Sequence, residues 1–180
     1  MTTSFLKRTV SLLVAISIFV SIPLTAFAGF YRNSELGWKI LVPRGWSAEP
    51  EVFNSMVTFN HPGNANGKST SFAVFAEPKD GRSFEEFLTE YRGRKQNGTG
   101  YTVTVHQDKP VVFNKKSAHQ FDVILRFLGT KTDTRAKSHE IIIEDDSSFN
   151  IFICGSYVKD WGKTKNTCDA FIKSFKKLVK

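Results

Sequence analysis

The chain has 180 residues, 41% of them hydrophobic, and a formal net charge of +8. This length suits one domain with a single core. The excess of positive charge favours acidic protein partners or an anionic membrane surface. Beyond the N-terminal region, no second apolar run is long enough to span a bilayer as a helix.

Residues 1–28 have the pattern of a secretory signal peptide. Lys7 and Arg8 precede an apolar run that Pro23 interrupts, and an A-x-A motif ends the segment. The apolar run is marginally shorter than the about 20 residues of a spanning helix, although an uncleaved anchor stays an alternative. We therefore expect one mature domain over residues 29–180, exported in soluble form to the periplasm or the cell exterior.

Export narrows the classes of partner. Nucleic acid is a poor expectation for an exported chain, and loss of Lys7 and Arg8 lowers the formal charge from +8 to +6. No cysteine stands at the cleavage point, which argues against a lipoprotein anchor. We expect a monomer whose partner is an acidic protein or an anionic membrane surface.

Three strands and a helix are predicted in the first half of the mature chain. Alternating apolar residues indicate strands at Trp38–Val42, Met56–Asn60 and Thr70–Glu77. Ser83 and Glu86 then form a capping-box pattern. The apolar residues that follow have helical spacing, so a helix begins there and ends near the glycine-rich QNGTG run.

Four more strands and a second helix are predicted in the second half. The strands are expected at 101–106, 117–128, 135–144 and 149–157, and the helix at 164–179. The last strand carries apolar residues on both faces, which is typical of a central, doubly covered strand. The fold class is therefore α+β: an antiparallel sheet of about six to seven strands flanked by helices, an α/β/α sandwich.

The stretch "GWKILVPRGW" opens the mature fold. Pro43 ends the first strand, and Gly45 supplies a turn position. Trp38 and Trp46 flank this turn. We expect them to seal one end of the sheet, with a ligand-binding platform as the alternative.

These residues carry a resemblance. "LGWKILVPRGW", with Trp38, Pro43, Gly45 and Trp46 at its defining positions, resembles the start of the PsbP-like family. The stretch "FAVFAEPKDGRSFEEFL" and the closing "FIKSFK" are also similar to that family. The family includes extrinsic photosystem II subunits, the periplasmic DcrB and the Ran-binding Mog, all α/β/α sandwiches. The resemblance implies an accessory or binding role without catalysis.

The two cysteines of the chain are Cys154 and Cys168. An even count in an exported chain favours a disulfide, with two buried thiols as the alternative. One cysteine is predicted on the last strand and the other on the inner face of the following helix, so the two could meet.

No metal, cofactor or catalytic site is predicted. The histidines His61, His106, His119 and His139 have no metal-ligand spacing. His119 and His139 are expected on neighbouring strands with their side chains on the same face, which would allow a metal pair, but structural histidines with satisfied hydrogen bonds are the favoured interpretation. Residues 85–86 belong to the helix cap, and the acidic run at 144–146 is interpreted as a polar turn.

Two functions stay open. The first is a non-catalytic accessory or binding protein of the cell envelope, with Lys165, Lys173, Lys176 and Lys177 on the outer face of the last helix as a contact patch. The alternative is that these lysines only face solvent, near a helix C-terminus where the helix dipole favours positive charge. The second function is a small secreted hydrolase-like enzyme or ligand-binding protein with a site that shows no motif.

Overall fold

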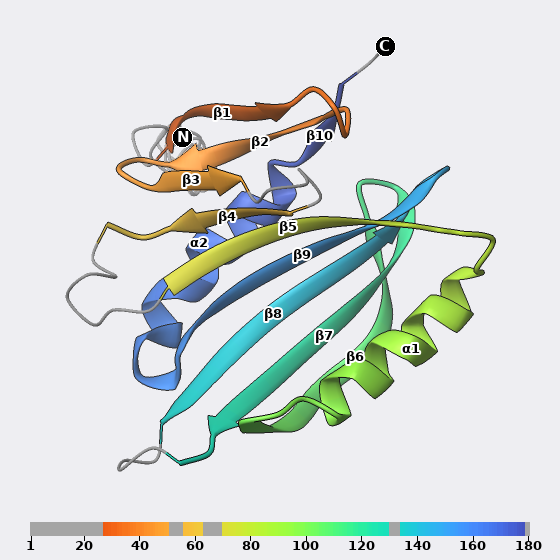
Figure 1. Cartoon of the computed structure of the whole chain (residues 1–180). Helices are drawn as coiled ribbons and strands as arrows, with labels where there is room; N and C mark the ends of the chain where they lie inside the picture. The colour runs from red at the N-terminus through yellow and green to blue at the C-terminus, as the bar shows by residue number, and fades with distance from the viewer. Residues whose placement is uncertain (1–26, 51–55, 63–69, 130–133, 179–180) are drawn as a thin grey trace, which may run out of the picture.

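A computed structural model of the chain describes residues 27–50, 56–62, 70–129 and 134–178. These residues form two sheets and two α-helices (Figure 1). The strands are β1 Phe27–Asn33, β2 Trp38–Pro43, β3 Ser47–Pro50, β4 Met56–Asn60, β5 Thr70–Pro78, β6 Tyr101–Phe113, β7 Lys116–Phe127, β8 Arg135–Glu144, β9 Ser148–Tyr157 and β10 Lys176–Lys177. The helices are α1 Phe84–Gln96, a short 3₁₀ turn η3 Val158–Asp160, and α2 Trp161–Lys173.

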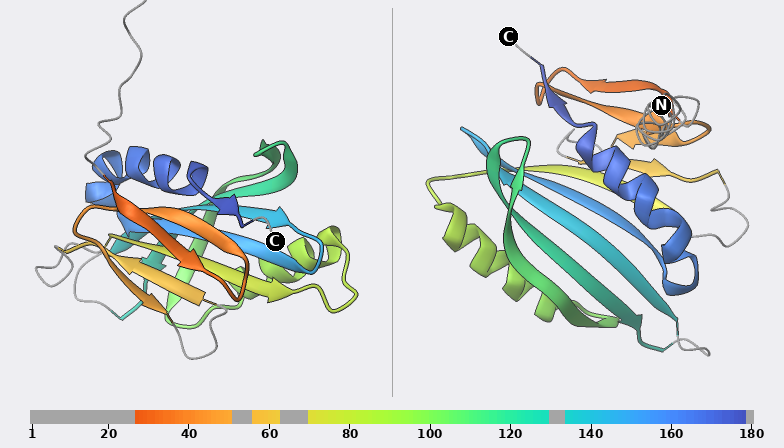
Figure 2. Two further views of the ribbon diagram at one scale, coloured as in Figure 1. Left: turned by 90° about the horizontal axis from the view of Figure 1, so that it is seen from above. Right: turned by 180° about the vertical axis from the view of Figure 1, so that it is seen from behind.

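The main sheet has seven antiparallel strands in the order β3-β4-β5-β9-β8-β7-β6. Helix α1 covers one face of this sheet, and α2 covers the other, as the front and rear views show (Figures 1 and 2). The predicted fold class is therefore confirmed. Strand β9 lies at the centre of the sheet, where the apolar pattern placed it.

Each face of β9 belongs to a different core. Phe152 and Cys154 are fully buried in the core beneath α2. Phe149 and Ile151 alternate with them and are buried in the core beneath α1. Both faces of the central strand are thus removed from water, which explains the unbroken apolar run at residues 151–154.

A second sheet, of order β1-β2-β10, was not predicted. β1 pairs with β2 along its length, and β10 pairs Lys176 with Lys39 and Lys177 with Trp38. This sheet lies beside α2, and its side chains Trp38 and Ile40 belong to the core under that helix (Figure 2). The sequence pattern missed β3 and β10 because such short edge strands carry little alternation, and it missed β1 because FAGFYRN does not alternate apolar and polar residues.

The end of α2 differs from the prediction. The apolar spacing predicted a helix to residue 179, but the helix ends at Lys173. The hydroxyl of Ser174 donates to the carbonyl of Phe171 and accepts from the backbone N–H of Leu41, 2.9 Å away on β2. The chain then leaves the helix, because its following backbone groups pair with β2 instead. Lys176 and Lys177 therefore lie on a strand, not on the outer face of a helix.

Strand β6 continues through Pro110 to Phe113, beyond the predicted end at residue 106. Pro110 pairs with His119 of β7, and a bulge at His106 interrupts the register between Val105 and Gln107. A proline is tolerated here because β6 is an edge strand, and one side of its backbone needs no partner.

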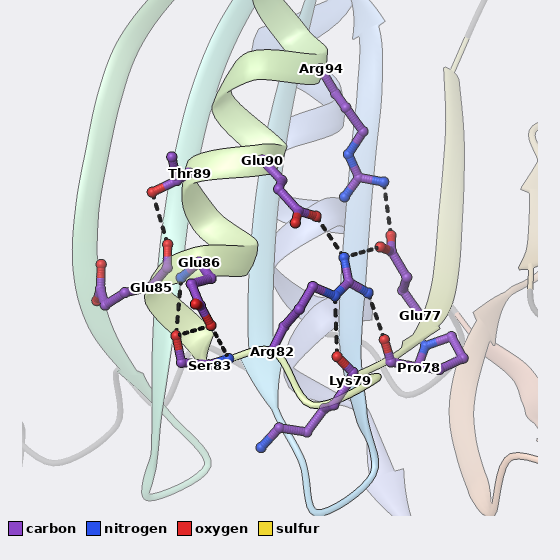
Figure 3. A network of polar contacts seen from close by, with 10 residues as sticks. All are labelled: Glu77, Pro78, Lys79, Arg82, Ser83, Glu85, Glu86, Thr89, Glu90 and Arg94. Atoms are coloured by element: carbon purple, nitrogen blue, oxygen red, sulfur yellow. Dashed lines mark hydrogen bonds and ion pairs between the residues drawn. The ribbon is translucent and has the colours of Figure 1, made fainter.

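Helix α1 is attached to the sheet by Arg82. The guanidinium of Arg82 donates to Glu77 of β5 at 3.1 Å and to Glu90 of α1 at 2.6 Å. It also donates to the backbone carbonyls of Pro78 and Lys79, so one side chain joins the strand, the turn and the helix (Figure 3).

Loss of the α1 cap should destabilise the fold by about 1 kcal/mol. The capping box is formed as predicted: the backbone N–H of Glu86 donates to the Ser83 hydroxyl, and the Glu86 carboxylate accepts from the Ser83 backbone. Ser83→Ala removes the first of these bonds, whereas Ser34→Ala on an exposed turn is a matched control. Urea unfolding measures both, and equal stabilities would contradict the cap's role.

Candidate binding cleft

The cleft at the end of α2 holds three of the four lysines that the sequence singled out. It has a volume of about 410 Å³ and lies between the β6–β7 hairpin, the β8–β9 turn and the segment that leaves α2. We call it the lysine cleft. It is lined by Phe113, Asn114, Lys116, Ile143, Asp145, Asn150, Lys173, Phe175, Lys176 and Lys177.

The hairpin that forms one wall is built by a two-residue turn. Phe113 pairs with Lys116 across this turn, and both Asn114 and Lys115 have positive φ, at 48° and 66°. Two consecutive residues of this kind match the strand twist of a tight hairpin. The Asn114 amide then donates to the carbonyl of Phe175 at 3.2 Å, which ties the hairpin to the segment after α2.

Two lysines of the cleft share one buried carboxylate. Asp145 is only 7% exposed, and it forms ion pairs with Lys116, at 3.1 Å, and with Lys177. Burial opposes the charge of Asp145, but hydrogen bonds from Lys177 and Lys116 outweigh it and hold the pKa of Asp145 below its ordinary value. From the sequence, this position was interpreted only as part of a polar turn. The ion pairs of Asp145 with the two lysines were not predicted.

The other two lysines of the cleft have no such partner. Within the described part of the chain, neither Lys173 nor Lys176 forms an ion pair, and both are exposed. Four lysines against one aspartate give the cleft a surplus of positive charge.

Lys165 is separate from this group. It precedes Lys173 by two helical turns, about 12 Å along the axis, and it pairs with Asp169 at 2.9 Å. The structure thus brings Lys173, Lys176 and Lys177 together, adds Lys116, and leaves Lys165 outside.

A disulfide holds α2 against the sheet that forms the floor of the cleft. As the sequence predicts, Cys154 of β9 and Cys168 of α2 are joined, with their Cα atoms 5.7 Å apart. Both residues are fully buried.

The two tryptophans of the opening stretch have different places. Trp38 is 1% exposed and packs against Tyr31 and Phe175, so it is a core residue. Trp46 is partly exposed and stacks on Phe72 with a centroid distance of 4.5 Å.

Trp46 also lines a second cleft of about 310 Å³ at the start of α2, together with His61 and Lys163. A third cleft, of about 450 Å³, lies beside α1 and includes Tyr91 and Lys95. Neither has the concentration of lysines that marks the lysine cleft.

His119 and His139 lie on opposite faces of the sheet, so the expectation of a shared face was wrong. His119 lies beside Phe121, in the direction of α1, and its Nε2 is 2.5 Å from Asp108. His139 pairs across the strands with Asp122, whose carboxylate is 2.5 Å from its Nδ1, on the α2 side. Each histidine has an acidic partner of its own.

All four histidines of the chain lie among the residues that the structure describes. No group of three or more histidine, cysteine or acidic side chains lies together within the described ranges. The three clefts described above are lined by neither His106 nor His119. A helix long and apolar enough to cross a membrane is not found among the described residues.

The free energy of unfolding should decrease at low pH, because protonation of Asp108 removes the charge that Arg92 stabilises. Arg92 donates two hydrogen bonds to Asp108 and, with a weaker contribution from His119, lowers its pKa from 3.8 to about 2 despite partial burial. A lowered pKa contributes stability that is complete above about pH 4 and is lost toward pH 2. Asp108→Asn should therefore lose about 1 kcal/mol at neutral pH, after allowance for solvent screening.

The measurement is urea unfolding of wild type and Asp108→Asn at several pH values. The difference between the two proteins should vanish as the pH approaches about 2. Asp146→Asn, on an exposed turn, is the control. A difference that stays constant with pH would contradict the assignment to the Asp108 carboxylate.

No family model matches the sequence, and no curated protein matches it. Solved structures do. CyanoP, the cyanobacterial PsbP from Synechocystis, has a TM-score of 0.62 at 12% identity, over 84% of this chain and 93% of CyanoP. LpqN, described as involved in cell envelope biogenesis of Mycobacterium tuberculosis, has a TM-score of 0.51 at 10% identity, over 79% and 83% of the two chains.

The Ran-binding protein Mog1p of Saccharomyces cerevisiae has a TM-score of 0.50 at 12% identity, over 83% of this chain and 94% of its own. These likenesses establish the fold. The chain has the PsbP/Mog1-like fold that the residues of its opening stretch predicted.

Proposed function

We propose that this protein is a non-catalytic binding protein of the cell envelope whose partner is an acidic protein held at the lysine cleft. The observation that carries the proposal is the pair Lys173 and Lys176, two exposed cations that line the cleft and form no ion pair with any residue that the structure describes. Carboxylates of a partner would supply the missing counter-ions. The description of Mog1p as Ran-binding agrees with a binding role, and that of LpqN as involved in cell envelope biogenesis agrees with an envelope setting.

Export is part of this proposal. The secretory pattern of residues 1–28 and the disulfide between Cys154 and Cys168 both suit an oxidising compartment outside the cytoplasm. Cleavage after Ala28 would keep Gly29–Asn33 in β1. N-terminal sequencing of the exported protein should read Gly-Phe-Tyr-Arg, and recovery of the uncleaved chain in the membrane fraction would contradict this.

The binding role is tested by affinity capture from envelope extract of cells that make the protein. We expect the wild type to retain a partner at low salt and to release it at high salt, because exposed charge pairs are screened. The double variant Lys173→Gln/Lys176→Gln should lose this partner. Lys165→Gln, on the same helix but outside the cleft, is the matched control and should keep it. Equal capture by all three proteins would overturn the proposal.

A further inference from the structure

The lysine cleft combines an apolar floor with its charged rim. Phe113, Ile143 and Phe175 line it and are 9%, 4% and 7% exposed. They come from three different elements: the hairpin, β8 and the segment after α2. A ligand that is only charged would leave this apolar surface unused, whereas an apolar group placed here would be removed from water.

The floor also contains a polar side chain without a partner. Asn150 lines the cleft and is 5% exposed, yet its side-chain amide forms no hydrogen bond to any other residue that the structure describes. The Asn150 amide atoms are not among the fully enclosed side-chain polar atoms that lack a partner in the described ranges, so they face the open cleft, where a bound group can replace solvent. The Asn150 side chain both donates and accepts, and a peptide group offers the matching acceptor and donor.

The lysines divide into fixed and free cations. Lys116 and Lys177 are held by Asp145 at one side of the cleft. Lys173 and Lys176 form no ion pair among the described residues, so an incoming carboxylate can engage them without displacing a carboxylate of those residues.

We propose that the lysine cleft takes a short acidic segment of a protein in which an apolar residue is adjacent to a carboxylate. The apolar side chain lies on Phe113, Ile143 and Phe175. The neighbouring carboxylate lies between Lys173 and Lys176, and the backbone of the segment bonds to the Asn150 amide. This inference rests on the proposed function and specifies what its partner must present.

A peptide fits these features better than an anionic membrane does. Lipid headgroups form a broad charged surface that would draw equally on Lys165, whereas the unpartnered amide and the apolar floor lie within one cleft of about 410 Å³. That volume is within the usual range of small-ligand sites, about 300–1,000 Å³, and suits a few residues of a peptide.

Three fluorescein-labelled peptides test the inference by anisotropy at low salt: Gly-Asp-Phe-Glu-Gly, Gly-Asp-Gly-Glu-Gly and Gly-Asn-Phe-Gln-Gly. The first carries both features, the second only the charges and the third only the aromatic ring. We expect the first to bind at least about tenfold more tightly than either other peptide, since burial of one large apolar side chain corresponds to such a factor. Equal binding of the first two, or no binding of the first, would overturn the inference.

Variants locate the site. Lys173→Gln/Lys176→Gln should abolish the preference for the acidic peptides, and Asn150→Ala should weaken the first peptide severalfold, while Lys165→Gln changes nothing. The lysine variants lie on the surface, so they keep the test decisive if Asn150→Ala does not fold. If the protein sediments with phosphatidylserine vesicles in a way that requires these lysines, and if it binds no peptide, then the ligand of the cleft is a membrane surface. That result would overturn the inference.

The outcome is separable from the proposed function. If the captured partner depends on Lys173 and Lys176 but the peptides show no need for the aromatic residue, the binding role stands and the two-part recognition fails. If neither capture nor peptide binding depends on the lysines, both fail.

Discussion

Lys95→Met should lower the free energy of unfolding by about 3–5 kcal/mol, because it leaves a buried carboxylate without its counter-ion. Glu140 is 2% exposed on β8. It accepts hydrogen bonds from Tyr91 at 2.6 Å and from Ser138 at 2.8 Å, and it forms an ion pair with Lys95 at 2.6 Å. Burial, and then the nearby charge of Glu140, raise the pKa of Tyr91 well above its ordinary value, so the phenol stays a hydrogen-bond donor.

The matched control is Lys79→Met, which breaks the more exposed ion pair between Lys79 and Glu144, also on β8. It should cost less than about 1 kcal/mol. Adding Glu140→Gln to Lys95→Met removes the buried charge and should recover part of the loss. Urea unfolding measures all three proteins. Similar losses for the Lys95 and Lys79 variants would show that Glu140 is not a buried ion.

Loss of the disulfide should cost about 3 kcal/mol in the chain-entropy model. Cys154 and Cys168 are 14 positions apart in sequence, and both are buried in the core under α2. The double variant Cys154→Ala/Cys168→Ala also leaves small voids in the core, which add to the loss of stability. The figure of about 3 kcal/mol is therefore a lower limit for this variant. Urea unfolding of the variant and of the oxidised wild type makes the comparison.

A reductant distinguishes the bridge from simple core packing. The wild type should lose most of the same stability when it is unfolded and refolded in reductant, whereas the alanine variant should not respond to it. Free thiols that titrate in the native, air-exposed wild type would contradict the disulfide.

The alternation of apolar residues was sufficient to predict the central sheet and α1. In strands such as β4 and β9, the order of apolar residues already indicates which faces are buried. The capping residue Ser83 likewise predicts the start of α1 to within a few residues. These features depend on local periodicity, on capping, and on the burial of one or both faces of a strand.

The features that form the lysine cleft depend on distant contacts. The apolar spacing of Phe171, Ile172 and Phe175 continues the helical period, yet the Ser174 hydroxyl meets the amide of Leu41, 133 positions away, and the chain turns into a strand. The residues next to Ser174 in the sequence give no indication of this hydrogen bond. It places Lys176 at the cleft instead of on a helix face.

The prediction that His119 and His139 share one face of the sheet was wrong because it, too, depended on a contact between separate strands. A strand changes its face with every residue, so a register error of one position moves a side chain to the other side of the sheet. The pairing of Asp122 with His139 fixes this register, and it places His139 on the face away from His119. The sequence contains no independent sign of this pairing.

The lysine cleft as a site for acidic partners is tested most directly by zero-length carbodiimide cross-linking of the captured complex, which joins carboxylates to lysines in contact. Peptide mapping by mass spectrometry then reports the lysines used. We predict cross-links from partner carboxylates to Lys173 and Lys176, and none to Lys165, which is also exposed but lies outside the cleft on α2. Cross-links concentrated on Lys165, or on lysines remote from the cleft, would contradict the account.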